Sequence, residues 1–87
     1  MFEIIKISYP VEMVSVHGFA FAKPKNLDAK WAAVDRDEEL WMFTEKPTWA
    51  DEIGQWVGVN NSRSERIAIV VYNGDPAESL VEVKQYV

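Results

Sequence analysis

Two short apolar runs separated by five charged residues constrain the fold of this chain more than any other feature. Trp31–Val34 and Leu40–Thr44 flank Asp35–Glu39, a segment of four acidic residues and one arginine. Short runs rich in aromatic and β-branched side chains, broken by a polar loop, are typical of a β-hairpin. A single helix over Leu27–Phe43 is the alternative, but it would place two aspartates in its middle. We therefore predict a hairpin.

Four further runs have the alternation or the apolar character of strands: Phe2–Tyr9, Val11–His17, Arg66–Tyr72 and Leu80–Val87. Arg66–Tyr72 is almost continuously apolar, which predicts a central strand that is covered on both faces. Leu80–Val87 is expected to pair with it. Gly18 is expected to mark a bend or a bulge.

Thr48–Val57 has two interpretations. Thr48 and Asp51 have the spacing of a capping box, and Trp49, Ile53 and Trp56 recur at helical intervals. These features predict one or two helical turns, although Gly54 weakens a helix. An extended loop is the alternative.

Together these elements predict one small domain over residues 1–87. We expect a mainly β fold, an antiparallel sheet of about five strands, or an α+β fold if the one short helix forms. Hydrophobic residues make up 48% of the chain and can fill a core of this size. The chain has no cysteine, so it must be stabilised by packing or by homo-oligomerisation rather than by disulfides.

The formal net charge of −5 limits the classes of molecule that the chain is expected to bind. Direct binding to nucleic acid is disfavoured because it needs a basic surface. A protein with a basic surface fits better. No stretch approaches the ~20 apolar residues of a membrane span, and the absence of cysteine suits a reducing cytoplasm. We therefore expect a cytoplasmic protein without a membrane partner.

The sequence gives little support for catalysis. His17 is the only histidine and no serine lies in a G-x-S-x-G motif, which disfavours a catalytic triad. One histidine without cysteine disfavours a zinc site, and the acidic segment lacks EF-hand spacing. The glycines form no phosphate-binding loop. We predict no catalytic residues, no metal and no cofactor, so the chain is not expected to be an enzyme.

A binding surface is the functional interpretation of the acidic segment, and a solvated turn is the alternative. Four tryptophans occur between residues 31 and 56, either as core or as part of a binding surface. Trp31 and Trp41 could also form a cross-strand pair. The candidate binding residues combine charge with aromatic side chains: Asp35, Asp37, Glu38, Glu39, Trp41 and Trp49.

Two patterns resemble small accessory proteins encoded by tailed bacteriophages. Trp31–Asp35, Leu40–Phe43 and Pro47 are similar to a W-x-A-V-D…L-W-x-F…P arrangement, and Gly74–Glu82 is similar to a G-D-x-x-x-S-L-x-E ending. The likeness runs over about Lys30 to Val83. It departs at Pro76, where the phage proteins often have an aromatic residue. The resemblance implies a phage or prophage protein that acts in the bacterial cytoplasm, and it implies no enzymatic activity.

We therefore expect a small, acidic, non-enzymatic binding protein that contacts a host protein. One alternative is a small-molecule-binding oligomer with a pocket between subunits, because so short a chain has little volume for a pocket of ~300 Å³ or more. The other is a minor structural or assembly protein that self-associates through an exposed strand, for which Leu80–Val87 is the candidate.

Overall fold

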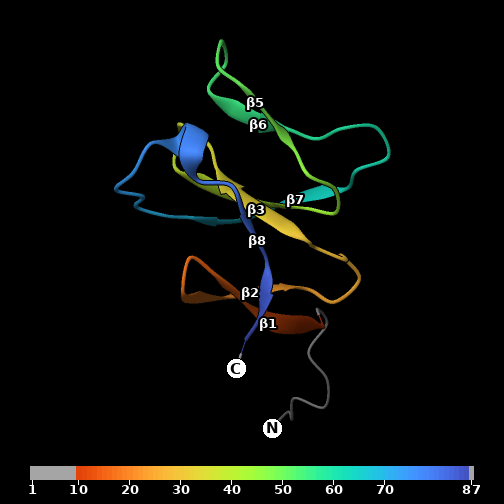
Figure 1. The fold of residues 1–87 in the computed structure, drawn as a ribbon. Helices are drawn as coiled ribbons and strands as arrows, with labels where there is room; N and C mark the ends of the chain where they lie inside the picture. The colour runs from red at the N-terminus through yellow and green to blue at the C-terminus, as the bar shows by residue number, and fades with distance from the viewer. Residues whose placement is uncertain (1–9, 87) are drawn as a thin grey trace, which may run out of the picture.

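The computed structural model describes residues 10–86, so the predicted strand Phe2–Tyr9 lies outside the described residues. The described elements, in chain order, are β1 (Val11–Val16), β2 (Phe19–Pro24), β3 (Trp31–Val34), β4 (Glu39–Phe43), β5 (Thr48–Ala50), β6 (Gln55–Val57), β7 (Ser64–Ile69), the 3-10 turn η1 (Pro76–Glu78), β8 (Val81–Glu82) and β9 (Lys84–Gln85) (Figure 1). Over these residues, no helix is long and apolar enough to cross a membrane.

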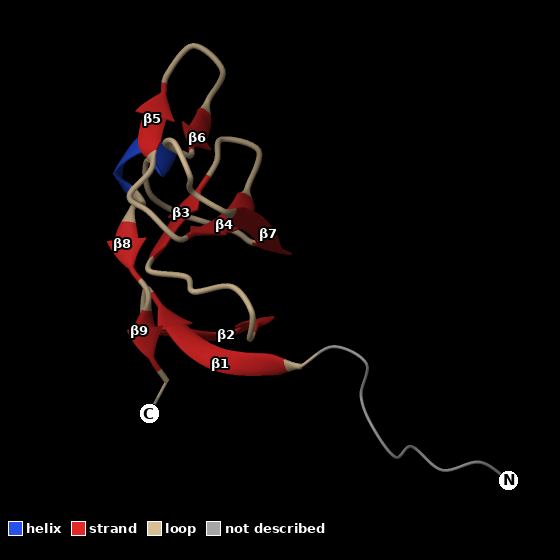
Figure 2. Ribbon diagram, turned by 90° about the vertical axis from the view of Figure 1, so that its right-hand side faces the viewer, coloured by secondary structure: helices blue, strands red, loops and turns tan. Residues whose placement is uncertain are grey.

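The strands form three antiparallel sheets. The larger sheet has the order β7-β4-β3-β8, the smaller sheet has the order β2-β1-β9, and β5 and β6 form a separate hairpin. Figure 2 shows the larger sheet between the β5–β6 hairpin and the smaller sheet. The mainly β class and the antiparallel pairing are confirmed. The described strands are shorter and more numerous than the five or so expected, and they are divided among sheets.

The segment Val81–Gln85 joins the larger and smaller sheets. β8 pairs with β3 through Glu82 and Trp31, and β9 pairs with β1 through Lys84 and Ser15. Val83 lies between the two strands, and its N–H bonds Lys30 O at 2.9 Å. The expectation that Leu80–Val87 pairs with Arg66–Tyr72 is therefore wrong.

The core lies between the facing sides of these two sheets. Its buried side chains come from both sheets and from the β2–β3 connection: Val14, Val16, Leu27, Ala32, Val34, Leu40 and Met42. In β3 and β4, alternate residues face this core, as the two-residue period of a strand requires. The opposite face of the larger sheet, which we call its outer face, carries Trp31, Ala33, Trp41 and Phe43.

The predicted hairpin over residues 31–44 is present as β3 and β4, with Trp31 opposite Phe43 and Val34 opposite Leu40. Asp35 N–H bonds Glu39 O at 2.9 Å and closes the charged loop. The predicted bend at Gly18 is the turn between β1 and β2, where φ is 51° at His17 and 81° at Gly18. Two consecutive positive φ values match the right-handed twist of the flanking strands.

Thr48–Val57 does not form the predicted helix, and its two halves are extended, as in the alternative interpretation, but they are paired strands rather than a loop. β5 and β6 form a hairpin in which Trp49 is opposite Trp56, with ring centroids 5.4 Å apart. Helical geometry is confined to the turn, where Gly54 N–H bonds Ala50 O at 2.9 Å. Gly54 has a φ of 67°, a value that ends a helical turn and lets the chain reverse.

The prediction of a central strand over Arg66–Tyr72 is also wrong. β7 lies at the end of the larger sheet and, over the described residues, pairs only with β4. Ile69 is 76% exposed and Val71 is 83% exposed. An apolar sequence predicts that the side chains of a strand are covered by other protein. It does not distinguish a strand that is buried in the core from one that is exposed at an interaction surface.

Candidate functional site

The β5–β6 hairpin is anchored to the loop between β3 and β4, above the outer face of the larger sheet (Figure 2). Trp56 N–H donates to Asp35 Oδ1 at 2.8 Å, and Arg36 N–H donates to Gly54 O at 2.9 Å. These two bonds place a tryptophan of β6 close to the acidic residues that follow β3.

A cleft of about 370 Å³ lies between this hairpin and the outer face. We call it the acidic-aromatic cleft. Its walls combine two tryptophans and a phenylalanine with two carboxylates, and its lining residues are Asp35, Glu39, Trp41, Phe43, Ile53, Gln55, Trp56, Val57, Gly58 and Ser64.

Asp35 is the buried acid of the cleft, with 4% of its surface exposed. Burial raises the pKa of the Asp35 carboxyl above its ordinary value of 3.8, because the charged form loses hydration. The hydrogen bond from Trp56 N–H partly offsets this increase, while the charges of Asp37 and Glu39 add to it.

Three carboxylates meet at this position. The nearest carboxylate oxygens of Asp35, Asp37 and Glu39 all lie within 4.8 Å of one another. Like charges at this separation repel, and the charges of Asp37 and Glu39 disfavour ionisation of Asp35. A positive charge placed among them would relieve this repulsion.

Glu39 is oriented by two neighbours. Trp41 Nε1 donates to its Oε1 at 3.2 Å, and Arg66 Nη1 donates to its Oε2 at 3.0 Å. Arg66 reaches this face because the register of β7 against β4 shifts between Leu40 and Trp41, which places Arg66 opposite Trp41. The Glu39 side chain retains 22% exposure beside the cleft.

The remaining acidic residues of the loop lie outside the cleft lining. Asp37 is exposed, and its Oδ1 accepts the Glu39 N–H at 3.2 Å. Glu38 is exposed and has a φ of 70°. Arg36 forms an ion pair with Asp51 at 3.5 Å and reduces the local negative charge.

Trp49 is half-buried and does not line the cleft. Its ring packs against Trp56, and Arg36 lies over it with 5.8 Å between the guanidinium carbon and the ring centroid. The predicted cross-strand pair of Trp31 and Trp41 is wrong, because Trp31 is opposite Phe43 and Trp41 is opposite Ala33. The cross-strand tryptophan pair is in β5 and β6.

The structure therefore brings together only some of the six candidate binding residues. Asp35, Glu39 and Trp41 line the cleft and Asp37 lies beside it, whereas Glu38 and Trp49 do not contribute to it. Sequence reasoning missed Trp56 as a specific site residue. The only signal for Trp56 was its membership of the tryptophan-rich stretch.

Comparison of the chain with protein-family models, with curated proteins and with solved structures finds no match.

Proposed function

We propose that this chain is a non-enzymatic binding protein, encoded by a phage or prophage, that holds a lysine or arginine side chain of a host protein in the acidic-aromatic cleft. The observation that carries the proposal is the convergence of three carboxylates beside a cleft walled by Trp41 and Trp56. The phage origin rests on the resemblance of residues 30–83.

The electrostatics of the cleft favour a cation. Asp35 is buried, and its pKa is raised by the loss of water and by Asp37 and Glu39. A lysine or arginine side chain would replace the lost hydration with a direct charge interaction. The net charge of −5 would also accelerate the approach of a basic partner.

The aromatic walls favour the same ligand. A cation over the face of a tryptophan is stabilised by about 0.5–2 kcal/mol, depending on how far it is desolvated. The chain already uses this interaction on the neighbouring surface, where Arg36 lies over Trp49 and Lys46 over Trp31. The cleft volume of about 370 Å³ lies within the usual range for ligand sites.

The proposal is tested with two matched peptides, one with three arginines and one with glutamines in their place. The indole N–H signals of the four tryptophans serve as NMR probes at known positions. We expect the arginine peptide to shift the Trp41 and Trp56 signals most, and Trp31, which does not line the cleft, least. A response that is equal at all four indoles would contradict the proposal.

Glu39→Gln and Glu38→Gln form a matched pair of variants, because each removes one negative charge from the same loop. We expect Glu39→Gln to weaken arginine-peptide binding about tenfold, the equivalent of ~1.4 kcal/mol, and Glu38→Gln to have a much smaller effect. Equal losses in the two variants would show that only the overall charge matters, and the cleft would then not be the site.

A further inference from the structure

One arginine of the chain already contacts a carboxylate of the acidic-aromatic cleft. Arg66 Nη1 donates to Glu39 Oε2 at 3.0 Å, and the two side chains form an ion pair. Glu39 lines the cleft, whereas Arg66 does not. Arg66 therefore reaches the cleft carboxylate from the neighbouring strand β7, and it is the same kind of cation that the cleft is proposed to bind.

An irregularity in the larger sheet places Arg66 on this face. Leu40 is opposite Ala68, so an unbroken register would put Ile67 opposite Trp41 on the outer face. The register shifts between Leu40 and Trp41, and Arg66 takes that place instead. Ile67 packs against the core cluster. The shift therefore exchanges an apolar side chain for a cation beside the cleft, which is how β-bulges re-aim side chains next to functional sites.

The ion pair of Arg66 and Glu39 is exposed enough to be exchanged. The Arg66 side chain is 58% exposed and the Glu39 side chain is 22% exposed. Water and salt screen an ion pair at such a position, so it contributes little net stability. Trp41 Nε1 donates to the other carboxylate oxygen of Glu39 at 3.2 Å. Because this bond does not involve Arg66, Glu39 keeps one of its two contacts when Arg66 leaves.

Arg66 and a second cation would oppose each other at Glu39. A carboxylate can accept more than two hydrogen bonds, so the competition is one of charge rather than of space. Arg66 neutralises the charge of Glu39, and its guanidinium would repel a lysine or arginine side chain that enters the cleft. The partner's cation gains a further interaction with the tryptophan walls of the cleft, which favours it over Arg66.

We propose that Arg66 is a built-in competitor of the partner's cation. It occupies Glu39 in the free chain, and a lysine or arginine side chain displaces it on entering the cleft. This inference rests on the proposed function of the cleft. It fixes the sign of one effect, because removal of Arg66 strengthens partner binding, whereas removal of a residue that only orients Glu39 would weaken it.

Arg66→Gln and Arg63→Gln form a matched pair, because each removes one positive charge from an exposed side chain in or beside β7. The Arg63 guanidinium donates to Asn26 O at 3.2 Å and does not line the cleft. We expect Arg66→Gln to bind the arginine peptide about threefold more tightly than Arg63→Gln does. Calorimetric titration measures both affinities. Equal affinities, or weaker binding by Arg66→Gln, would overturn the inference.

A double-mutant cycle with Glu39→Gln shows whether Arg66 acts through this carboxylate. With glutamine at position 39 there is no carboxylate for Arg66 to neutralise. We therefore expect Arg66→Gln to bring no more gain in that background than Arg63→Gln does. A threefold gain that persists without the Glu39 carboxylate would show a general effect of charge, and the inference would then be wrong.

The displacement can also be observed directly in the wild-type chain. In an isotope-labelled chain with unlabelled arginine peptide, the Nε–H signal of Arg66 is assigned by its loss in Arg66→Gln. We expect the peptide to move this signal toward its position in Glu39→Gln, because the guanidinium loses the carboxylate in both cases. An Arg66 signal that stays in place while the peptide saturates the cleft would contradict displacement.

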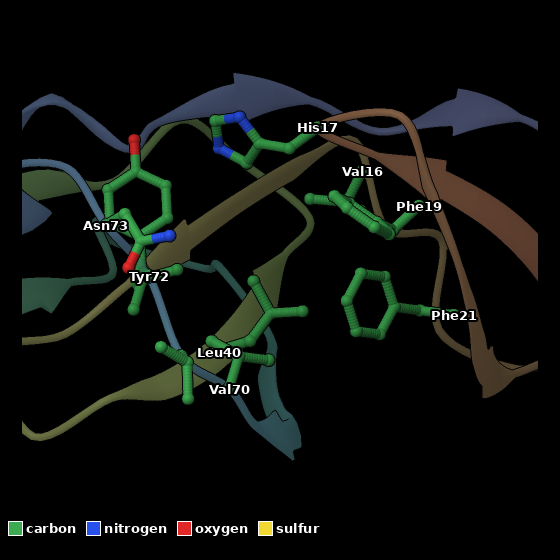
Figure 3. Close-up of a pocket in the computed structure, with 10 residues that line it drawn as sticks. Val16, His17, Phe19, Phe21, Leu40, Val70, Tyr72 and Asn73 are labelled. Carbon is green, nitrogen blue, oxygen red and sulfur yellow. The ribbon is translucent and has the colours of Figure 1, made fainter.

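His17 provides the control signal for this titration. Its ring lines a separate hollow of about 240 Å³, where Phe21 and Leu40 also lie (Figure 3). The lining of this hollow shares no residue with that of the cleft. We expect the His17 ring signals to remain unchanged when the peptide binds. A shift of the His17 signals as large as that of Arg66 would indicate a general rearrangement and would overturn the inference.

The failure of the inference and the failure of the proposed function give different results. If the arginine peptide binds neither the wild-type chain nor Arg66→Gln, the proposed function is wrong and the inference falls with it. If the peptide binds and shifts the Trp41 and Trp56 signals, but Arg66→Gln brings no gain over Arg63→Gln, only the inference is wrong.

Discussion

At the scale of single residues, Ser79 shows how one hydroxyl connects distant parts of the chain. It is fully buried, with 0% exposure. Its Oγ accepts Val34 N–H at 2.8 Å and lies 2.7 Å from Pro76 O, and its own carbonyl lies 2.7 Å from His17 Nε2. Ser79 thereby ties the end of β3 to η1 and to the β1–β2 turn.

We expect Ser79→Ala to lower the free energy of unfolding by about 1–3 kcal/mol, because Val34 N–H would remain buried without an acceptor. Urea unfolding followed by tryptophan fluorescence measures the change. Ser62→Ala is the control, since the Ser62 hydroxyl forms only a 3.4 Å contact near the surface, and it should change stability by less than about 0.5 kcal/mol. Equal effects would contradict the structural role of Ser79.

Asp35 predicts a pH dependence of stability. Because burial raises the pKa of its carboxyl above 3.8, the folded chain retains this proton at pH values where the unfolded chain has lost it. Unfolding then releases a proton, so this residue's contribution to stability decreases as pH rises through that window.

The comparison with Asp35→Asn isolates this contribution, because asparagine does not titrate and its carbonyl can still accept Trp56 N–H. We expect the free energy of unfolding of the wild-type chain, minus that of the variant, to decrease between about pH 3 and about pH 7. Urea unfolding at several pH values measures this difference. A difference that increases with pH would show that Asp35 is stabilised in its charged form.

At the scale of elements, the turn of the β5–β6 hairpin requires glycine at position 54 for two reasons, a positive φ and the close approach of Arg36. Gly54 has a φ of 67°, and a Cβ at this position would lie 2.9 Å from Arg36 Cβ. Gly18 also has a positive φ, of 81°, but a Cβ there would meet nothing within 4 Å. The two glycines therefore separate backbone strain from steric overlap.

We expect Gly18→Ala to destabilise the fold by about 1–2 kcal/mol, the cost of left-handed backbone in a residue with a Cβ. Gly54→Ala should cost more, because Arg36 must also move away from its bond to Gly54 O and from Trp49. The free energies of unfolding of the two variants measure the difference. If both variants lost the same stability, the approach of Arg36 would have no energetic role.

The elements also show what the sequence could predict. The β3–β4 hairpin was predictable because its two apolar runs flank a charged loop within one short stretch. The β5–β6 hairpin was not, because Trp49, Ile53 and Trp56 fit a helical period as well. What distinguishes the two structures is the bond from Trp56 N–H to Asp35, which joins residues far apart in the chain.

The candidate site, like the two hairpins, was predictable from the sequence only in part. Charge and aromatic character pointed to Asp35, Glu39 and Trp41, which the structure places in one cleft. The same properties pointed to Glu38 and Trp49, which do not line it. The side to which a loop residue turns depends on its φ, and that angle follows from contacts that composition does not encode.

At the scale of the whole molecule, the two main sheets share one core. Val14 and Val16 of the smaller sheet pack in the same cluster as Leu40 and Met42 of the larger sheet. Because neither sheet has a core of its own, we expect the two sheets to unfold together in a single transition.

The positions of the tryptophans allow this prediction to be tested. All four lie in β3, β4, β5 and β6, so tryptophan fluorescence reports on the larger sheet and the hairpin, whereas far-UV circular dichroism reports on every strand. We expect both signals to give the same midpoint in urea. Two different midpoints would mean that the smaller sheet unfolds independently.

The connection made by Val81–Gln85 has a consequence for folding during synthesis. A ribosome makes a protein from its N-terminus at about 5–20 residues per second, and segments begin to fold as they emerge. The β1–β2 and β3–β4 hairpins can form early, since their partners are neighbours in the chain. Neither sheet is nevertheless complete until the end of the described chain has been made, because β8 belongs to the larger sheet and β9 to the smaller one. Until then, the nascent chain holds two incomplete sheets with exposed edges, a state in which newly made proteins are prone to aggregate and are bound by chaperones.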